Sequence, residues 1–193
     1  PEKYWLDHAD QTFEDPDVIA VCGPGVLPKT ATFFQKVSNK VYALSGGFTG
    51  IRYEKGKKRE IDDWPTCNFL ARKKNFLESG GFDQKYWGGE DTQICYSLLS
   101  KGGKMIYDPD VLAYHHPRVA ISNHIRQVFF WGLWRGFFMK LYPQRSRKIV
   151  FLIPLAFLSW LVIAGVISVF SPFVWSVYIG VLWLYLFYLI LNS

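Results

Sequence analysis

Two adjacent carboxylates, Glu90 and Asp91, are the side chains of this sequence most suited to chemistry. They follow residues 80–89, a segment rich in glycine and aromatic residues. Neighbouring acids repel each other, which raises the pKa of one of them, while the N-terminal dipole of a following helix favours the charged form. A carboxylate under these opposed influences is suited to accept a proton as a general base. The alternative is an ordinary acidic first turn of a helix.

The glycines and the tryptophan just before these acids have the character of a binding loop. Trp87 offers a flat aromatic face of the kind on which a sugar ring stacks, and Gly88 and Gly89 allow the backbone to come close to a ligand. The earlier pair at 80–81 can end a helix with positive φ. We therefore expect Trp87, Gly88 and Gly89 to contact the substrate.

Several short elements are needed to position these residues. The pattern predicts helices in residues 1–15, 30–45 and 91–101, the second facing the core because its apolar residues recur at helical spacing. It predicts strands at 18–22, 66–71, 105–107 and 111–114, and a hairpin with a basic tip within 48–61. This is an α/β pattern.

The three cysteines are too few and too scattered for a disulfide framework or a zinc site. Cys22, Cys67 and Cys95 form no Cys-x-x-Cys pair and leave an odd count. Reduced thiols in a cytosolic compartment are the expectation, each packed in the core.

Two segments look like a metal-binding Asp-x-Asp motif and are expected to be turns. Residues 15–17 and 108–110 both contain proline between two aspartates. Asp and Pro are typical turn residues, so neither segment is assigned as a metal site.

The chain combines a charged part with an apolar part. The sequence has 193 residues, of which 50% are hydrophobic and 18% aromatic, with a formal net charge of +6. No Lys, Arg, Asp, Glu or His occurs in residues 149–193, where stretches 149–170 and 173–191 are each long enough to cross a hydrocarbon core of about 30 Å. Two membrane-spanning helices are therefore predicted.

Basic and aromatic residues without any acid fill residues 119–148, which is the composition of an amphipathic helix at a membrane surface. A helix that binds nucleic acid is the other interpretation, and the uncharged residues that follow favour the membrane. Basic residues beside a span predict that this end stays in the cytoplasm.

Five motifs, taken in order, resemble the second half of a family 2 glycosyltransferase with the GT-A fold. They are residues 68–76, residues 80–83, the pair Glu90-Asp91, residues 102–109 and the pair His115-His116. The resemblance covers residues 1–118, and the apolar tail is similar to that of membrane-anchored members. It implies the C-terminal half of a GT-A (Rossmann-like) domain.

The resemblance also implies site residues and reactants. Asp91 would be the general base on the acceptor hydroxyl and Glu90 would orient it, in an inverting transfer from a nucleotide-diphosphate sugar. Asn68 would lie near the acceptor pocket, although a satisfied structural Asn is equally open. One of His115 and His116 would close over the donor diphosphate or its metal.

The sequence departs from the family in two ways. It has no upstream Gly-rich nucleotide loop and no upstream Asp-x-Asp, so the divalent metal (Mg or Mn) expected for the full-length enzyme would have its ligands mostly outside this chain. Polymer-making members carry Gln-x-x-Arg-Trp, where this chain has Gln127 followed by Phe130 and Trp131. This favours transfer of a single sugar.

The sequence thus predicts three parts: a partial GT-A catalytic domain at 1–118, an interfacial amphipathic helix region at 119–148 and a transmembrane helical hairpin at 149–193. We expect a multi-pass protein of the cell membrane with a cytoplasmic catalytic domain. Its partners would be a nucleotide-diphosphate sugar, a lipid-linked or glycan acceptor and the membrane, with no nucleic acid. A processive polysaccharide synthase and a non-catalytic membrane protein with a degenerate glycosyltransferase half remain as alternatives.

Overall fold

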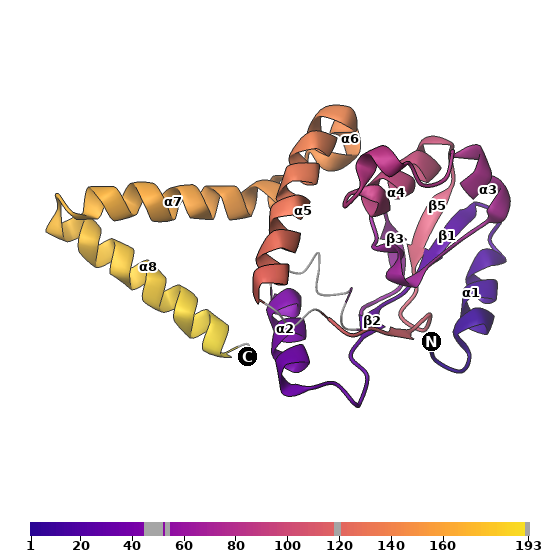
Figure 1. The fold of residues 1–193 in the computed structure, drawn as a ribbon, viewed down its shortest axis with the longest axis horizontal. Coiled ribbons are helices and arrows are strands. Elements are labelled where there is room, and N and C mark those ends of the chain that lie inside the picture. Colours follow the sequence, from indigo (N-terminus) through magenta and orange to yellow (C-terminus); the bar gives the residue numbers. More distant parts are fainter. Residues whose placement is uncertain (45–51, 53–54, 118–120, 192–193) are drawn as a thin grey trace. The chain divides into compact units, whose positions relative to one another are not determined.

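The computed structural model describes residues 1–44, 52, 55–117 and 121–191. The chain forms two compact units, Pro1–Arg145 and Ser146–Ser193. Figure 1 colours the elements in chain order.

The first unit contains a mixed four-stranded sheet with the order β3-β5-β1-β4. Its strands are β1 (Val18–Cys22), β3 (Arg59–Ile61), β4 (Phe69–Ala71) and β5 (Lys104–Tyr107). β1 and β5 are parallel, while β4 pairs antiparallel with β1 and β3 pairs antiparallel with β5. Two short strands, β2 (Gly25–Val26) and β6 (Ala113–Tyr114), form a separate parallel pair. The predicted α/β class is confirmed. The structure shows in addition that the sheet is mixed, with parallel and antiparallel pairs.

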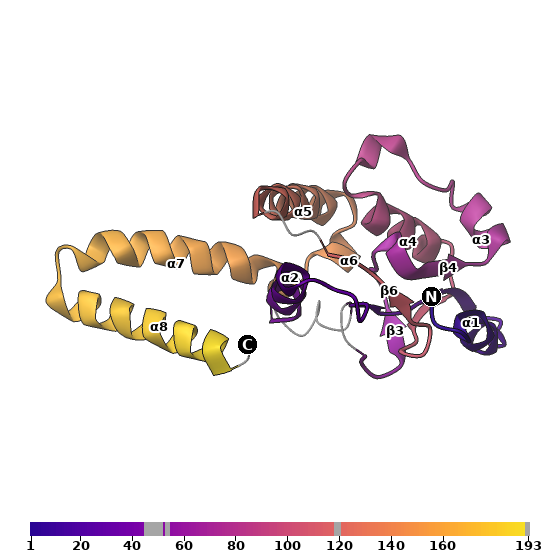
Figure 2. The same ribbon diagram turned by 60° about the horizontal axis from the view of Figure 1, so that its bottom comes forward.

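Helices cover both faces of this sheet (Figures 1 and 2). β1 is buried along its whole length, as its run of apolar residues predicts. On one face, α1 (Trp5–Phe13) packs through Ala9 against Val18 and Val21. On the other face, α4 (Glu90–Ser100) packs against Ala20 and Cys22.

The predicted apolar face of α4 is confirmed. Ile94, Cys95 and Leu98 have no exposed surface and Leu99 has little. Gly102 and Gly103 follow the helix with φ of 95° and 94°, a conformation that favours glycine, so the chain reverses there into β5. The Gly80-Gly81 pair has positive φ as well and ends α3 (Lys73–Glu78).

The helix predicted within residues 30–45 is present as α2 (Phe33–Leu44), but the expectation that it faces the core is wrong. Phe33, Phe34 and Val37 are all exposed. Periodicity identifies an apolar face without specifying what covers it. Of the hairpin predicted within 48–61, residues 48–51 and 53–54 lie outside the described residues, and its described strand β3 pairs with β5.

Both Asp-x-Asp segments form turns. The backbone N–H of Asp17 donates to Oδ1 of Asp15 over 2.9 Å, and that of Asp110 donates to Oδ1 of Asp108 over 3.0 Å. These local hydrogen bonds are what Asp contributes to a turn. Of the cysteines, Cys22 and Cys95 are buried as expected, whereas Cys67 is exposed, and all three are free thiols.

A long helix, α5 (Ile121–Leu141), belongs to the first unit and is followed by α6 (Pro143–Ser146). One side of α5 packs through Trp134 and Phe138 on the apolar cluster that contains the buried residues of α4. Its other side exposes Ile125, Phe129 and Leu133.

The second unit is a pair of apolar helices. A short 3₁₀ segment (Ile149–Leu152) leads into α7 (Ile153–Ser168), and α8 (Pro172–Leu191) returns beside it. Ring contacts join the pair: Phe157 to Tyr185 at 5.2 Å and Trp160 to Tyr178 at 5.4 Å between centroids. Residues 149–168 and 172–191, with mean hydropathy 2.6 and 2.0, are long and apolar enough to cross a membrane.

Candidate functional site

Asp91 lies in the first turn of α4 with one of its two carboxylate oxygens fixed. Oδ1 accepts hydrogen bonds from the backbone N–H of Thr66 at 3.2 Å and from the Thr66 hydroxyl at 2.5 Å. Among the described residues, no side chain or backbone N–H donates to Oδ2. The carboxylate is therefore oriented through Oδ1, and Oδ2 has no hydrogen-bond donor in the described part of the chain.

Burial raises the pKa of the Asp91 carboxyl above its ordinary value. The two hydrogen bonds from Thr66 act in the opposite direction, and the negative charges of Glu90 and Asp63 raise the pKa further. A carboxylate with a raised pKa has a greater affinity for a proton, which is what a general base requires. Of the two influences predicted from the sequence, the repulsion by Glu90 is present, but burial raises the pKa more, and the opposing influence comes from Thr66.

Glu90 contacts the glycine loop. Its Oε2 accepts from the backbone N–H of Gly88 at 2.5 Å. This bond closes the turn that leads into α4, so Glu90 holds the loop next to Asp91.

Thr66 reaches Asp91 because its own segment is fixed to the sheet. Thr66–Asn68 form one 3₁₀ turn directly before β4. Trp64, two residues before Thr66, is buried, and its indole N–H donates to the carbonyl of Gly23 at 3.1 Å. At the other end of the turn, the amide of Asn68 donates to the carbonyls of Pro24 and Val111 at 3.1 and 2.8 Å.

Asn68 is used by the protein itself. It is 2% exposed, and its Oδ1 accepts from the indole N–H of Trp5 at 2.9 Å in addition to the two bonds that it donates. Burial and the use of both its amide N–H bonds and its Oδ1 favour the structural alternative over direct contact with an acceptor.

Asp63 forms a second charged group beside Asp91. Its carboxylate pairs with the guanidinium of Arg135 at 2.7 Å and with that of Arg52 at 3.7 Å. It also accepts from the hydroxyl of Thr92, the residue after Asp91, at 3.0 Å. Burial would raise the pKa of the Asp63 carboxyl, but the two guanidinium groups hold that pKa below its ordinary value. Asp63 therefore stays charged.

The glycine loop approaches a tryptophan. A Cβ on Gly89 would lie 2.8 Å from the ring of Trp134 and 3.1 Å from Phe138, and one on Gly88 would lie 3.3 Å from Nε1 of Trp134. That indole N–H donates to the carbonyl of Trp87 at 3.0 Å. Helix α5 thus approaches these glycines closely, and the expected contact of Trp87, Gly88 and Gly89 with a substrate stays a prediction. The ring of Trp87 is 67% exposed and can meet a ligand.

His115 and His116 are exposed at the end of β6, in the two-stranded sheet. The backbone N–H of His115 donates to the carbonyl of Val26 at 2.9 Å. The structure places the histidine pair on a different element from Thr66 and α4, and a role toward a donor stays a prediction.

A depression of about 310 Å³ opens beside Thr66 along β4. Its walls are aromatic, and two of its rings, Phe76 and Phe82, contact each other at 5.5 Å between centroids. The other lining residues are Thr66, Phe69, Ala71 and Lys73.

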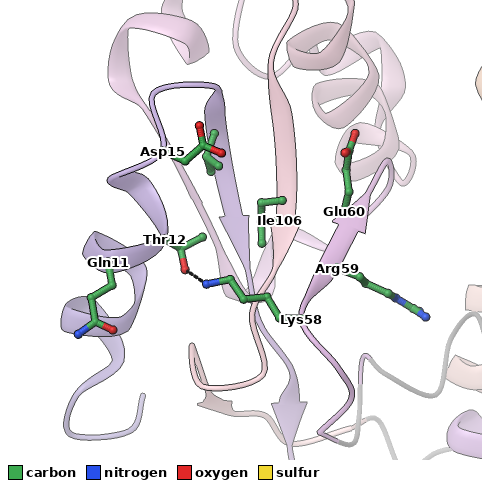
Figure 3. Close-up of a pocket in the computed structure, with 8 residues that line it drawn as sticks. Gln11, Thr12, Asp15, Lys58, Arg59, Glu60 and Ile106 are labelled. Carbon is green, nitrogen blue, oxygen red and sulfur yellow. Dashed lines mark hydrogen bonds between the residues drawn. The ribbon is translucent and has the colours of Figure 1, made fainter.

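A second depression, of about 290 Å³, lies between α1 and β3 and contains none of the residues around Asp91 (Figure 3). The ammonium group of Lys58 donates to the hydroxyl of Thr12 at 2.6 Å and pairs with Asp108 at 2.8 Å. The charge of Lys58 is therefore already neutralised within the protein.

A metal site is not apparent in the part of the chain that the structure describes: no three His, Cys, Asp or Glu side chains come together there. The acids of the two turns pair with lysines instead, Asp17 with Lys104 and Asp108 with Lys58. These residues do not fit a divalent cation.

Four residues of the site were not identified from the sequence: Thr66, Asp63, Arg135 and Trp134. Glu90, Asp91 and Trp87, which the sequence did indicate, lie close together along the chain. The hydrogen bonds of the other four residues join positions 25 to 72 residues apart. The adjacent acids Asp62 and Asp63, directly before Trp64, are the sequence feature that could have pointed to this part of the site.

Comparison with known proteins supports a relationship to glycosyltransferases. The chain is 29% identical over 68 residues to the pre-mycofactocin glycosyltransferases of two Mycobacterium tuberculosis strains, CDC 1551 / Oshkosh and ATCC 25618 / H37Rv. The match covers 35% of this chain and 14% of each relative. No family model matches the chain, and no solved structure gives a significant match.

Proposed function

We propose that this chain is the C-terminal portion of a membrane-anchored, inverting glycosyltransferase of family 2 with a GT-A fold. The donor is a nucleotide-diphosphate sugar, and the acceptor is a lipid-linked or cell-envelope glycan at the membrane. The observation that carries the proposal is the Asp91 carboxylate at the start of α4, which Thr66 fixes through Oδ1 while no described residue donates to Oδ2. The similarity to a glycosyltransferase and the two apolar helices support it.

The carboxylate supplies the proton acceptor that such a transfer needs. As the acceptor oxygen forms its bond to the anomeric carbon, the bond from that carbon to the diphosphate oxygen breaks and the nucleoside diphosphate leaves. Oδ2 of Asp91 takes the proton of the acceptor hydroxyl, which leaves the product neutral at the new bond. Glu90 and Thr66 keep the carboxylate in position.

A transfer assay tests this function. Membranes that contain the full-length protein would be incubated with radiolabelled nucleotide-diphosphate sugars, one at a time, and label would be counted in the lipid and glycan fractions. Label from at least one donor, absent from membranes without the protein, is the expected result. Long polymer would favour the processive alternative, and no incorporation from any donor would favour the non-catalytic one.

The hydroxyl of Thr66 should set the pH dependence of transfer. It stabilises the charged form of Asp91, so Thr66→Val should raise the pKa of that carboxyl. Because the base must be deprotonated, the acidic limb of the kcat/KM profile should move to higher pH. Thr66→Ser keeps the hydroxyl and serves as the matched control. If the profile of Thr66→Val coincides with that of Thr66→Ser, Thr66 does not tune the base.

We further propose that α7 and α8 cross the cell membrane, with residues 1–148 on the cytoplasmic side. Seven basic residues and no acid lie in residues 118–148, whereas the turn between the two helices carries no charge. Basic residues close to a span are retained in the cytoplasm, where nucleotide sugars are made.

Cysteine labelling on intact cells tests this topology. In a Cys67→Ser background, which removes the exposed native thiol, a cysteine at Ser171 should react with an impermeant reagent added outside. A cysteine at the exposed Gln144 should react only after the cells are opened. Labelling at Gln144 in intact cells would place Asp91 on the outer side of the membrane, away from the nucleotide sugars made in the cytoplasm. That result would contradict the proposed function.

A further inference from the structure

Helix α5 contacts both sides of the Asp91 site through two consecutive residues. Trp134 packs on the glycine loop before Asp91, and Arg135 pairs with Asp63. Consecutive residues on a helix point about 100° apart, so a single turn of α5 serves both contacts. The base and the loop before it are therefore supported by a helix that starts 30 residues further along the chain.

The Arg135–Asp63 pair is largely buried. The side chains are 21% and 10% exposed, and Arg135 also donates to the hydroxyl of Tyr96 on α4 at 3.3 Å. Removing one member of such a pair leaves the other charge buried without compensation, which costs much more than losing an exposed pair. The pair is thus a strong constraint on the segment that contains Asp63.

Asp63 transmits that constraint to Asp91 by two routes. Along the chain it lies three residues before Thr66, whose N–H and hydroxyl hold Oδ1 of Asp91. Across space, its Oδ1 accepts from Thr92, the residue next to Asp91. A change at Arg135 therefore reaches the base without any direct contact.

We propose that Arg135 is a positioning residue for sugar transfer, which fixes the Asp91 carboxylate through its ion pair with Asp63 and so makes the base depend on the docking of α5. This inference rests on the proposed function of Asp91. The ring of Trp134 also contacts that of Tyr86, at 5.9 Å between centroids, and so adds to the docking of α5.

The pair should influence charge as well as geometry. The charged groups that act on Asp91 and Asp63 come from α4, from the segment before β4, from residue 52 and from α5: Glu90, Asp63, Arg52 and Arg135. The thiols of Cys22, Cys67 and Cys95, whose pKa values are raised mainly by burial, also face these acids. Without Arg135, the negative charge of Asp63 is neutralised less completely, and Asp91 holds its proton to a higher pH.

A double-mutant cycle on the full-length protein in membranes tests the inference. Arg135→Met removes the charge and retains the length, and Asp63→Asn removes the partner. We expect Arg135→Met to lower kcat about 10-fold or more, with the donor KM little changed, and to move the acidic limb of the profile to higher pH. The double variant should lose less than the product of the two single losses, with its acidic limb close to that of the wild type.

Two further variants separate positioning from a general loss of structure. Lys140→Met removes an exposed charge from the same helix and should leave kcat and the profile unchanged. Arg135→Lys retains the charge without the planar fork, so it should keep the acidic limb of the wild type with a partial loss of kcat. If Arg135→Met does not fold, the comparison of Arg135→Lys with the wild type tests the inference.

Wild-type kcat and an unchanged acidic limb in Arg135→Met would overturn the inference, as would losses that multiply independently in the double variant. If Arg135→Lys has both the same kcat and the same pH profile as Arg135→Met, the positive charge at residue 135 does not contribute to the positioning of Asp91. An active Asp91→Asn would instead contradict the proposed function itself, so the two failures can be told apart.

Discussion

Replacing Asp91 by Asn in the full-length protein is expected to reduce sugar transfer about 10²- to 10⁴-fold, which is the usual contribution of a general base. Asn has the shape of Asp and can still accept from Thr66, so the loop and α4 should keep their structure. What the amide lacks is the ability to take the proton from the acceptor hydroxyl. Binding of the nucleotide sugar should change little.

Glu90→Gln is the matched control for this substitution. It removes the neighbouring negative charge, but its amide oxygen can still accept from the N–H of Gly88, so the turn into α4 should persist. A smaller loss of rate is expected, together with a lower pKa at Asp91 because a repelling charge is gone. Turnover of Asp91→Asn equal to that of the wild type would show that another group takes the proton.

Gly23→Ala should have the largest effect on stability. Gly23 directly follows β1, and a Cβ there would lie 1.5 Å from the carbonyl oxygen of Val111 and 2.9 Å from Nδ2 of Asn68. Because the nearest atoms are backbone, a side-chain rotation cannot relieve the clash. We expect a loss above about 3 kcal/mol, beyond the usual range for overpacking, and a fall in Tm on the order of 10 °C.

Gly132→Ala provides the comparison. Gly132 lies within α5, and a Cβ there would meet no atom within 4 Å. Alanine is the better helix former by about 0.5–1 kcal/mol, so the Tm should stay the same or rise. Near-UV circular dichroism in detergent, recorded during heating, would measure both variants. Equal melting of Gly23→Ala and Gly132→Ala would contradict the close packing of Val111 on Gly23.

The elements that carry the site could be predicted from the sequence because their signals are local. The run of β-branched and apolar residues at Val18–Cys22 predicts a buried strand, and β1 is buried throughout. The spacing of Ile94, Cys95 and Leu98 predicts the inner face of α4, and these residues are fully buried. Glycines after α3 and α4 predict where the helices end, and they have positive φ.

The contacts that orient Asp91 could not be predicted, because they join distant parts of the chain. Thr66 is 25 residues from Asp91, and Arg135 is 72 residues from Asp63. Neither residue belongs to a motif, and each matters only because β4 and α5 bring it to α4. The same limit applies to α2. The spacing of its apolar residues predicts an apolar face but contains no information about what covers that face.

The configuration of the transferred sugar tests the central claim most directly. If Asp91 deprotonates the acceptor in a single displacement, the anomeric carbon must invert. With an α-linked nucleotide-sugar donor, proton NMR of the product should therefore show a β-glycosidic linkage. A product with the α-linkage of the donor would contradict a single displacement with Asp91 as its base.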